Sequence, residues 1–298
     1  MESLFRTIPI SLEQGLAYGI VALGLVISFR ILAFPDLTVD SSFALGGAVV
    51  ARLIMEGLPP IYGIWIAVIC GFVSGCCTGL LNTRLKINSL LSGILMMTIL
   101  YSVNLRIMGR SNIQLLTVET FLTPLENMDV NRFIPIISFF FIASFGIKFL
   151  TDLFFRTQIG LAMRATGDNE QMIRSLGVNT DNMTVLGLGI SNALVALSGA
   201  LVAQDQGFAD IGMGIGMIVA GLASIIIGET LAGKRTVQRM TFAALSGSVI
   251  YKLIISIGLR LGLAPTDLKM ATGAMVILAL GIPALKRKKE EKVHLRGI

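Results

Sequence analysis

Apolar residues in this chain are gathered into long runs that are separated by short polar connectors. The runs cover approximately 12–33, 41–56, 61–82, 89–108, 133–151, 184–204, 213–231, 240–259 and 270–285. Most are close to the length of about 20 residues that an α-helix needs to cross a bilayer. They lack the alternation of polar and apolar residues that is typical of a β-barrel. We therefore predict an all-α, polytopic membrane protein with about eight to ten transmembrane helices, nominally nine.

A helix-breaking segment, Pro35 to Asp40, lies between the first two runs and reads Pro-Asp-Leu-Thr-Val-Asp. A proline and two carboxylates cannot face lipid. We expect a broken helix at 34–41, at the surface or facing a protein-lined cavity. Polar residues here and in later runs are candidates for lining a pathway through the bundle: Asp36, Thr38, Asp40, Ser41, Asn104, Asn192 and Gln204. The alternative is that they hold helices together by hydrogen bonds or lie at the membrane interface.

The composition agrees with a membrane protein. Of the 298 residues 54% are apolar and 14% are charged, against about 25% charged in an ordinary soluble domain. The mean hydropathy is +0.81. These values exclude a disordered chain and argue against a water-soluble globule. We expect one transmembrane domain over 1–298, embedded in a lipid bilayer.

The distribution of Lys and Arg predicts the topology. With the basic tail 286–298 in the cytoplasm, the inner segments carry 15 of the 24 Lys and Arg residues and the outer segments carry 5. The inner segments are 29–40, 83–88, 152–183, 232–239 and 286–298. This bias follows the positive-inside rule and explains the net charge of +6 without nucleic acid as a partner. It also places the N-terminus outside, and we expect the first run to be a retained helix.

Few residues in the sequence indicate a metal, catalytic or nucleotide site. The sole histidine, His294, lies in the tail, and the three cysteines fall in one apolar run, so neither a metal site nor a catalytic site is predicted. Gly228 to Arg235 fits G-x-x-x-x-G-K but has Arg235 where Ser or Thr should follow, and no strand precedes it. We expect no cofactor in this chain, no ATP hydrolysis and no enzyme activity.

Small residues recur at a spacing of four, most clearly at Gly71, Gly75 and Gly79. This spacing lets helix backbones approach closely in a membrane. We favour packing between helices of one subunit, and a subunit interface is the alternative.

The long inner segment 152–183 carries the most informative pattern. Asp168 or Asn169 can cap a short helix that runs to about Leu176, and Gly177 can end it. We predict a helix at about 168–176 that lies along the membrane surface. It is either a docking element for a partner or an ordinary solvated connector.

The sequence from Gly160 to Asn169, followed by Leu176 to Asn179, resembles the cytoplasmic coupling region of ABC importer permeases. The branch is the one that serves branched-chain amino acids, ribose and related sugars, and nucleosides. The stretch Ser191–Ala203 resembles the following helix of that family. Two further stretches, 28–39 and 93–109, are similar to a sub-branch of poorly characterised bacterial permeases, some of which are assigned to aromatic amino acids. The Thr-Val-Asp of the break departs from the Ser-Val-Gly of the sugar permeases, which makes a sugar less expected.

The resemblance implies a membrane-spanning subunit that forms the pathway for a small solute in the bacterial inner membrane. Two permease subunits, which we expect to be identical, would share one pathway above two ATPase subunits that bind ATP and Mg. An extracytoplasmic lipoprotein would deliver the substrate. The resemblance places the contact with the ATPase at Arg164, Gly167, Asp168, Asn169, Glu170, Arg174 and Gly177.

The most expected substrate is an amino acid, aromatic or branched-chain. Three alternatives stay open: a sugar or nucleoside permease of the same family, a self-sufficient secondary transporter or channel, and a membrane enzyme. A secondary transporter would show inverted halves and an intramembrane ion site. The sequence shows neither a convincing repeat nor a relay of charges.

Overall fold

The computed structural model describes residues 2–126, 133–233 and 235–262, together with 267, 270, 272–274 and 277. Most of the ninth apolar run and the whole basic tail 286–298 lie outside the described residues. Each of the first eight apolar runs forms a helix, as the pattern predicts. Seven are long and apolar enough to cross a membrane: α1 (Glu2–Leu25) with the π-helix η1 (Val26–Ile31), α2 (Thr38–Met55), α3 (Pro60–Thr83), α4 (Ser89–Met108), α6 (Phe133–Phe154), α9 (Thr180–Gln206) and α11 (Val237–Arg260).

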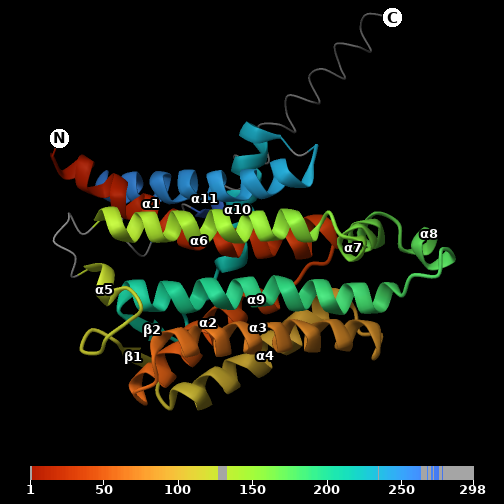
Figure 1. Cartoon of the computed structure of the whole chain (residues 1–298), viewed down its shortest axis with the longest axis horizontal. Helices are drawn as coiled ribbons and strands as arrows, with labels where there is room; N and C mark the ends of the chain where they lie inside the picture. Colours follow the sequence, from red (N-terminus) through yellow and green to blue (C-terminus); the bar gives the residue numbers. More distant parts are fainter. Residues whose placement is uncertain are drawn as a thin grey trace, which may run out of the picture.

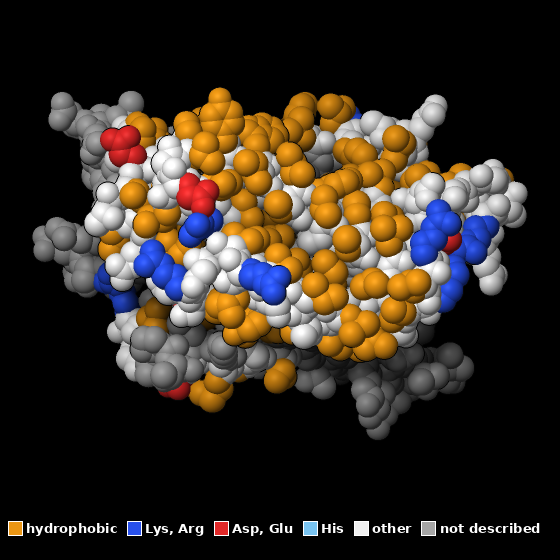
Figure 2. All heavy atoms as spheres, turned by 90° about the horizontal axis from the view of Figure 1, so that it is seen from below, with side chains coloured by type: hydrophobic (Ala, Val, Ile, Leu, Met, Phe, Trp, Pro, Cys, Tyr) orange, Lys and Arg blue, Asp and Glu red, His pale blue; other side chains and the backbone are white. Residues whose placement is uncertain are grey.

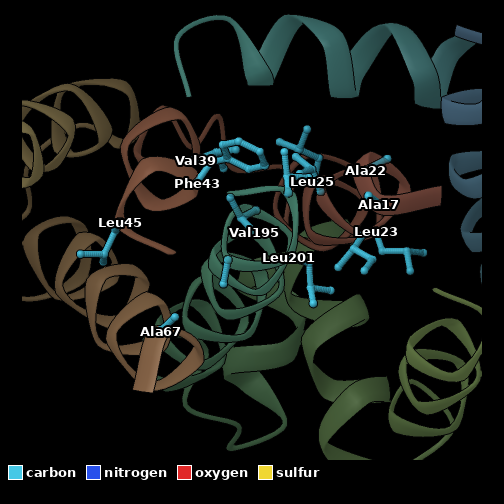
Figure 3. Close-up of a cluster of buried hydrophobic side chains, with 14 of the residues drawn as sticks. Ala17, Ala22, Leu23, Leu25, Val39, Phe43, Leu45, Ala67, Val195 and Leu201 are labelled. Carbon is cyan, nitrogen blue, oxygen red and sulfur yellow. The ribbon is translucent and has the colours of Figure 1, made fainter. Parts of the chain in front are cut away.

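The remaining apolar helix, α10 (Met217–Ala232), differs from the full span expected for 213–231. It has 16 residues, fewer than the ~20 of an upright span. It runs across the direction of the long helices, and the close-up shows it side-on while α9 is seen nearly end-on (Figures 1 and 3). The helix begins only at Met217, after the start of the predicted run, because the glycine-rich stretch 212–216 forms a turn, with Gly216 at φ 92°.

Short elements gather at the two ends of the bundle (Figure 1). The coupling end, as we name it, carries α7 (Gln158–Asp168) and α8 (Glu170–Ser175). The opposite end carries α5 (Thr123–Glu126) and a two-stranded antiparallel sheet of β1 (Asn112–Gln114) and β2 (Phe208–Asp210). The pattern of the sequence did not predict this sheet.

Helix α9 lies at the centre of the core, with side chains such as Val195 and Leu201 packed between α1, α2 and α3 (Figure 3). The glycine row of α3 packs against α9. A β-carbon at Gly75 would overlap with the carbonyl oxygen of Leu188, and one at Gly71 would overlap with Ala196. The glycines therefore bring two helices of one subunit together, which is the reading that we favoured.

The outward faces of α3, α4 and α6 are mostly apolar. Trp65 and Ile69 on α3 are 63% and 60% exposed, and Figure 2, which views the α3–α4 side, shows a largely hydrophobic surface. Basic side chains mark the coupling end, and several also lie within the other half of this face (Figure 2). Such a surface must be covered by lipid or by another subunit.

Candidate functional site

The break connects η1 to α2 through an irregular segment that contains a buried carboxylate. The chain leaves η1 at Ile31, passes Ala33 at a left-handed φ of 51°, and enters α2 at Thr38. Asp36 is fully buried. Its carboxylate accepts one hydrogen bond from the backbone N–H of Thr38 at 2.9 Å and one from Nδ2 of Asn192 at 2.7 Å. The carboxylate thus stabilises the first turn of α2 and ties it to the middle of α9.

Hydroxyl pairs continue this contact between α2 and α3. The hydroxyls of Thr38 and Thr78 lie 2.8 Å apart, and those of Ser42 and Ser74 lie 3.0 Å apart. All four side chains are buried. The structure therefore brings Asp36, Thr38 and Asn192 together as one polar seam inside the bundle, where they join helices of the same chain.

The other residues singled out for a pathway occupy separate positions. Ser41 donates to the carbonyl oxygen of Met97 at 2.9 Å, and Nδ2 of Asn104 donates to the carbonyl oxygen of Ser41 at 3.1 Å. Gln204 accepts from the backbone N–H of Phe121 at 2.9 Å, so it fastens the loop that precedes α5 to α9. These contacts are structural links between elements, and none of these side chains joins the seam around Asp36.

Asp40 has a role that the sequence did not indicate. Its carboxylate accepts hydrogen bonds from the backbone N–H groups of Gly216 at 3.0 Å and Ile218 at 2.9 Å, and so caps the N-terminus of α10. At the other end of α10, Glu229 forms an ion pair with Arg30 of η1. Residues on both sides of the break thus hold the two ends of the transverse helix. Arg30 and Glu229 are 199 positions apart, and nothing in the local sequence pairs them.

The coupling end is built from two helices that meet at Asn169. Of the two candidate caps, Asn169 is the residue that caps α8: its side chain accepts from the backbone N–H of Met172 at 3.0 Å. Asp168 is instead the last residue of α7. Gly177 follows α8 at φ 83°, a conformation that favours glycine. The helix expected at 168–176 is therefore confirmed, with slightly shorter bounds.

The side chain of Arg174 forms hydrogen bonds with residues of its own chain. Its guanidinium donates to Glu170 at 2.6 Å, to Asp181 at 2.8 Å and to the hydroxyl of Thr180 at 2.7 Å. Asp181 also lies 3.8 Å from Nζ of Lys86 in the turn between α3 and α4. Glu170 and Arg174, which we expected to contact the ATPase, thus fix α8 to the start of α9.

Arg164 and Gly167 lie on α7 and differ in their surroundings. Arg164 is exposed and borders a cavity of about 230 Å³ with Arg156 and Arg235. Gly167 packs against the end of η1, where a β-carbon would overlap with the carbonyl oxygen of Ile31. The coupling segment therefore rests directly on the break.

An open cavity of about 600 Å³ lies beside this contact. Its walls come from the break, the α3–α4 turn, α7, α8 and the start of α9, and they include Phe34, Lys86, Thr166 and Glu170. Within the part of the chain that the structure describes, no group of His, Cys, Asp and Glu residues is arranged to hold a metal ion. The cavity thus lies where α7 and α8 meet the bundle.

Residues 8–280 match the family model of the branched-chain amino acid transport system permease component. The chain belongs to this permease family. It is the permease component of an ABC importer and is not itself an enzyme, and such a component implies ATPase and substrate-binding partners. It is a multi-pass membrane protein.

Relatives of known name cover nearly the whole chain. It is 42% identical to a tyrosine transport system permease protein of Clostridioides difficile, over 94% of this chain and 97% of that one. It is 38% identical to the uncharacterized protein RP368 of Rickettsia prowazekii (93% and 97%). The fructose import permease FruF of Bifidobacterium longum is 24% identical (96% and 82%). The fold resembles PsaBC from Streptococcus pneumoniae, solved in complex with Fab, with a TM-score of 0.52, 14% identity and coverage of 92% and 89%.

Proposed function

We propose that this permease imports an aromatic amino acid, with tyrosine as the first candidate. The observation that carries the proposal is the 42% identity to the tyrosine transport permease over 94% of the chain. The identity to the fructose permease is 24%, so a sugar is less well supported. The substrate would cross between two copies of this chain.

The ATPase would dock on α7 and α8. Their exposed apolar residues support this: Ile159 and Leu161 on α7 are 48% and 51% exposed, and Met172 and Leu176, on and just after α8, are 54% and 69% exposed. Exposed apolar side chains of this kind are typical of a protein–protein contact. Closure of two ATPase subunits around ATP and Mg would then move α7 and α8 as one rigid body.

Two contacts would pass this motion to the bundle. Gly167 presses on Ile31 at the end of η1, and Arg174 links α8 to Asp181 of α9. Because η1 leads through the break to the ends of α10, a shift of α7 would reach the transverse helix. This is our proposed route from ATP binding to the pathway.

The coupling end would face the cytoplasm of a bacterium, and the sheet end would face the exterior. The excess of Lys and Arg in the segments of the coupling end supports this orientation. An extracytoplasmic lipoprotein would deliver the substrate to the sheet end, and the tail 286–298 would lie in the cytoplasm.

Uptake of radiolabelled tyrosine tests this function. The permease, its ATPase and its lipoprotein are expressed in a bacterium that lacks its own aromatic amino acid uptake. We expect ATP-dependent accumulation that excess phenylalanine or tryptophan reduces, and that leucine, ribose and nucleosides do not. A complex whose ATPase cannot hydrolyse ATP is the control. The aromatic assignment would be rejected if excess phenylalanine and tryptophan left the accumulation of tyrosine unchanged while a sugar, a nucleoside or leucine reduced it.

A further inference from the structure

Three arginines converge on the cavity of about 230 Å³ at the coupling end. Arg156 lies in the turn after α6, Arg164 on α7 and Arg235 in the connector before α11, and all three side chains are exposed. The three positions are far apart in the sequence, so the fold gathers the guanidinium groups around one space. At about 30 Å³ for each water molecule, this space has room for a group of the size of a phosphate.

The positive charge around this cavity has no partner among the described residues. None of the ion pairs formed by those residues involves the three guanidinium groups. Asp152, which also lines the cavity, accepts from Nζ of Lys148 at 2.6 Å and from the hydroxyl of Thr241 at 2.7 Å. Like charges around one space repel each other, and the first turn of α11, in the same wall, adds the positive end of a helix dipole. The cavity therefore favours an anion.

Exposed apolar side chains lead from two membrane-spanning helices to this cavity. On α6, Phe149 and Leu153 are 68% and 52% exposed, and Leu153 lies three residues before Arg156. On α11, Phe242 is 46% exposed and lies four residues beyond Gln238 of the cavity wall. Arginines at the ends of apolar spans lie at the level of the lipid headgroups. The ligand that fits both surfaces has an anionic head and apolar chains.

We propose that the three arginines bind the phosphate of an anionic phospholipid from the leaflet at the coupling end, and that its acyl chains lie along α6 and α11. Guanidinium groups form paired, charge-assisted hydrogen bonds with phosphate oxygens. Basic pockets between spanning helices are typical sites for anionic headgroups. Because Arg164 belongs to α7, the bound lipid ties this surface helix to the ends of α6 and α11. The site does not depend on which substrate the permease carries.

Native mass spectrometry of the full-length permease tests the site. The protein in mild detergent is titrated with phosphatidylglycerol, and the fraction that retains lipid gives an apparent Kd. We expect Arg156→Gln and Arg235→Gln each to raise this Kd about tenfold, because each removes charge-assisted hydrogen bonds.

Arg239→Gln is the matched control. Arg239 is exposed in the first turn of α11 and lies outside the cavity wall, so its replacement removes the same charge without touching the site. All substituted side chains are exposed, and an unchanged Tm without added lipid confirms that each variant is folded. An equal Kd for the wild type and all three variants would overturn the site.

Two further ligands test the source of the phosphate. Phosphatidylcholine with the same acyl chains has no net charge, and we expect it to bind at least about tenfold more weakly. Inorganic phosphate has the charge without the chains, and we expect it to displace phosphatidylglycerol only at concentrations at least about a hundredfold higher. Equal retention of phosphatidylcholine would show that the chains alone hold the lipid, and displacement by equimolar phosphate would assign the cavity to a free anion. Either result would overturn the proposal.

An acidic segment of the ATPase is the other anion available at the coupling end. Co-purification of the ATPase with each permease variant separates this possibility from the lipid. We expect Arg156→Gln and Arg235→Gln to retain the ATPase as the wild type does. Loss of the ATPase from both variants, with an unchanged Kd for phosphatidylglycerol, would overturn the lipid site and assign the arginines to the ATPase.

Discussion

Gly167 of α7 lies against the carbonyl oxygen of Ile31, the last residue of η1. The fit leaves no room for a β-carbon at position 167. Beside it, a β-carbon at Gly187 of α9 would come within 2.5 Å of the side chain of Leu32. Because closely packed interiors transmit displacement with little slack, a shift of α7 must move the start of the break.

Replacement of Gly167 by alanine is therefore expected to impair transport. Overpacking costs about 1–3 kcal/mol, and here this cost destabilises the packing of α7 against η1. We therefore expect the rate of uptake to fall about tenfold. The measurement is ATP-driven uptake alongside ATP hydrolysis by the complex. Gly146→Ala on α6 is the control, because a β-carbon there would meet nothing within 4 Å. Equal uptake by both variants would show that the contact does not carry the motion.

Much of the fold was predictable because span length and hydropathy are local properties of the sequence. Each of the first eight apolar runs became a helix, and the Asn169 cap and the Gly177 terminus followed from local chemistry. The transverse course of α10 was not predictable. Its two ends are held by Asp40, 176 positions from Gly216, and by Arg30, 199 positions from Glu229.

The candidate site was predictable only in part. Asp36 and Asn192 could be singled out as polar residues in apolar surroundings, but their mutual hydrogen bond spans 156 positions. Glycines at close contacts, such as Gly167, look like ordinary membrane glycines until the neighbouring backbone is known.

The α3–α9 contact gives a prediction for stability. A β-carbon at Gly75 would overlap with the carbonyl oxygen of Leu188 on the central helix, and backbone cannot move aside as a side chain can. We expect Gly75→Ala to destabilise the folded protein by about 1–3 kcal/mol. Thermal unfolding in detergent should show a clearly lower Tm for this variant and an unchanged one for Gly146→Ala. An unchanged Tm for both would mean that the two helices can separate at little cost.

Arg174 should matter more for coupling than for stability. Its side chain is 50% exposed, and exposed ion pairs contribute about 0–1 kcal/mol. We expect Arg174→Ala to leave Tm nearly unchanged but to lower uptake per ATP hydrolysed, because α8 loses its tie to Thr180 and Asp181. Arg174→Lys should restore little of the coupled uptake, since an ammonium lacks the planar guanidinium geometry that bonds Glu170, Thr180 and Asp181 together. Arg52→Ala, which removes an exposed pair with Glu56 at the other end, is the control and should transport normally.

Asp40 should control the first turn of α10. Alanine at this position removes the acceptor of two backbone N–H groups and a negative charge at a helix N-terminus, at a cost of about 1–2 kcal/mol. Asparagine retains one acceptor oxygen, so we expect about half of that cost. Hydrogen exchange should quicken at residues 216–220 in Asp40→Ala, less in Asp40→Asn, and stay unchanged in α11. Because Arg30 still holds Glu229 at the far end of α10, the helix should fray from its start alone; faster exchange along its whole length would show that Asp40 holds the entire helix in place.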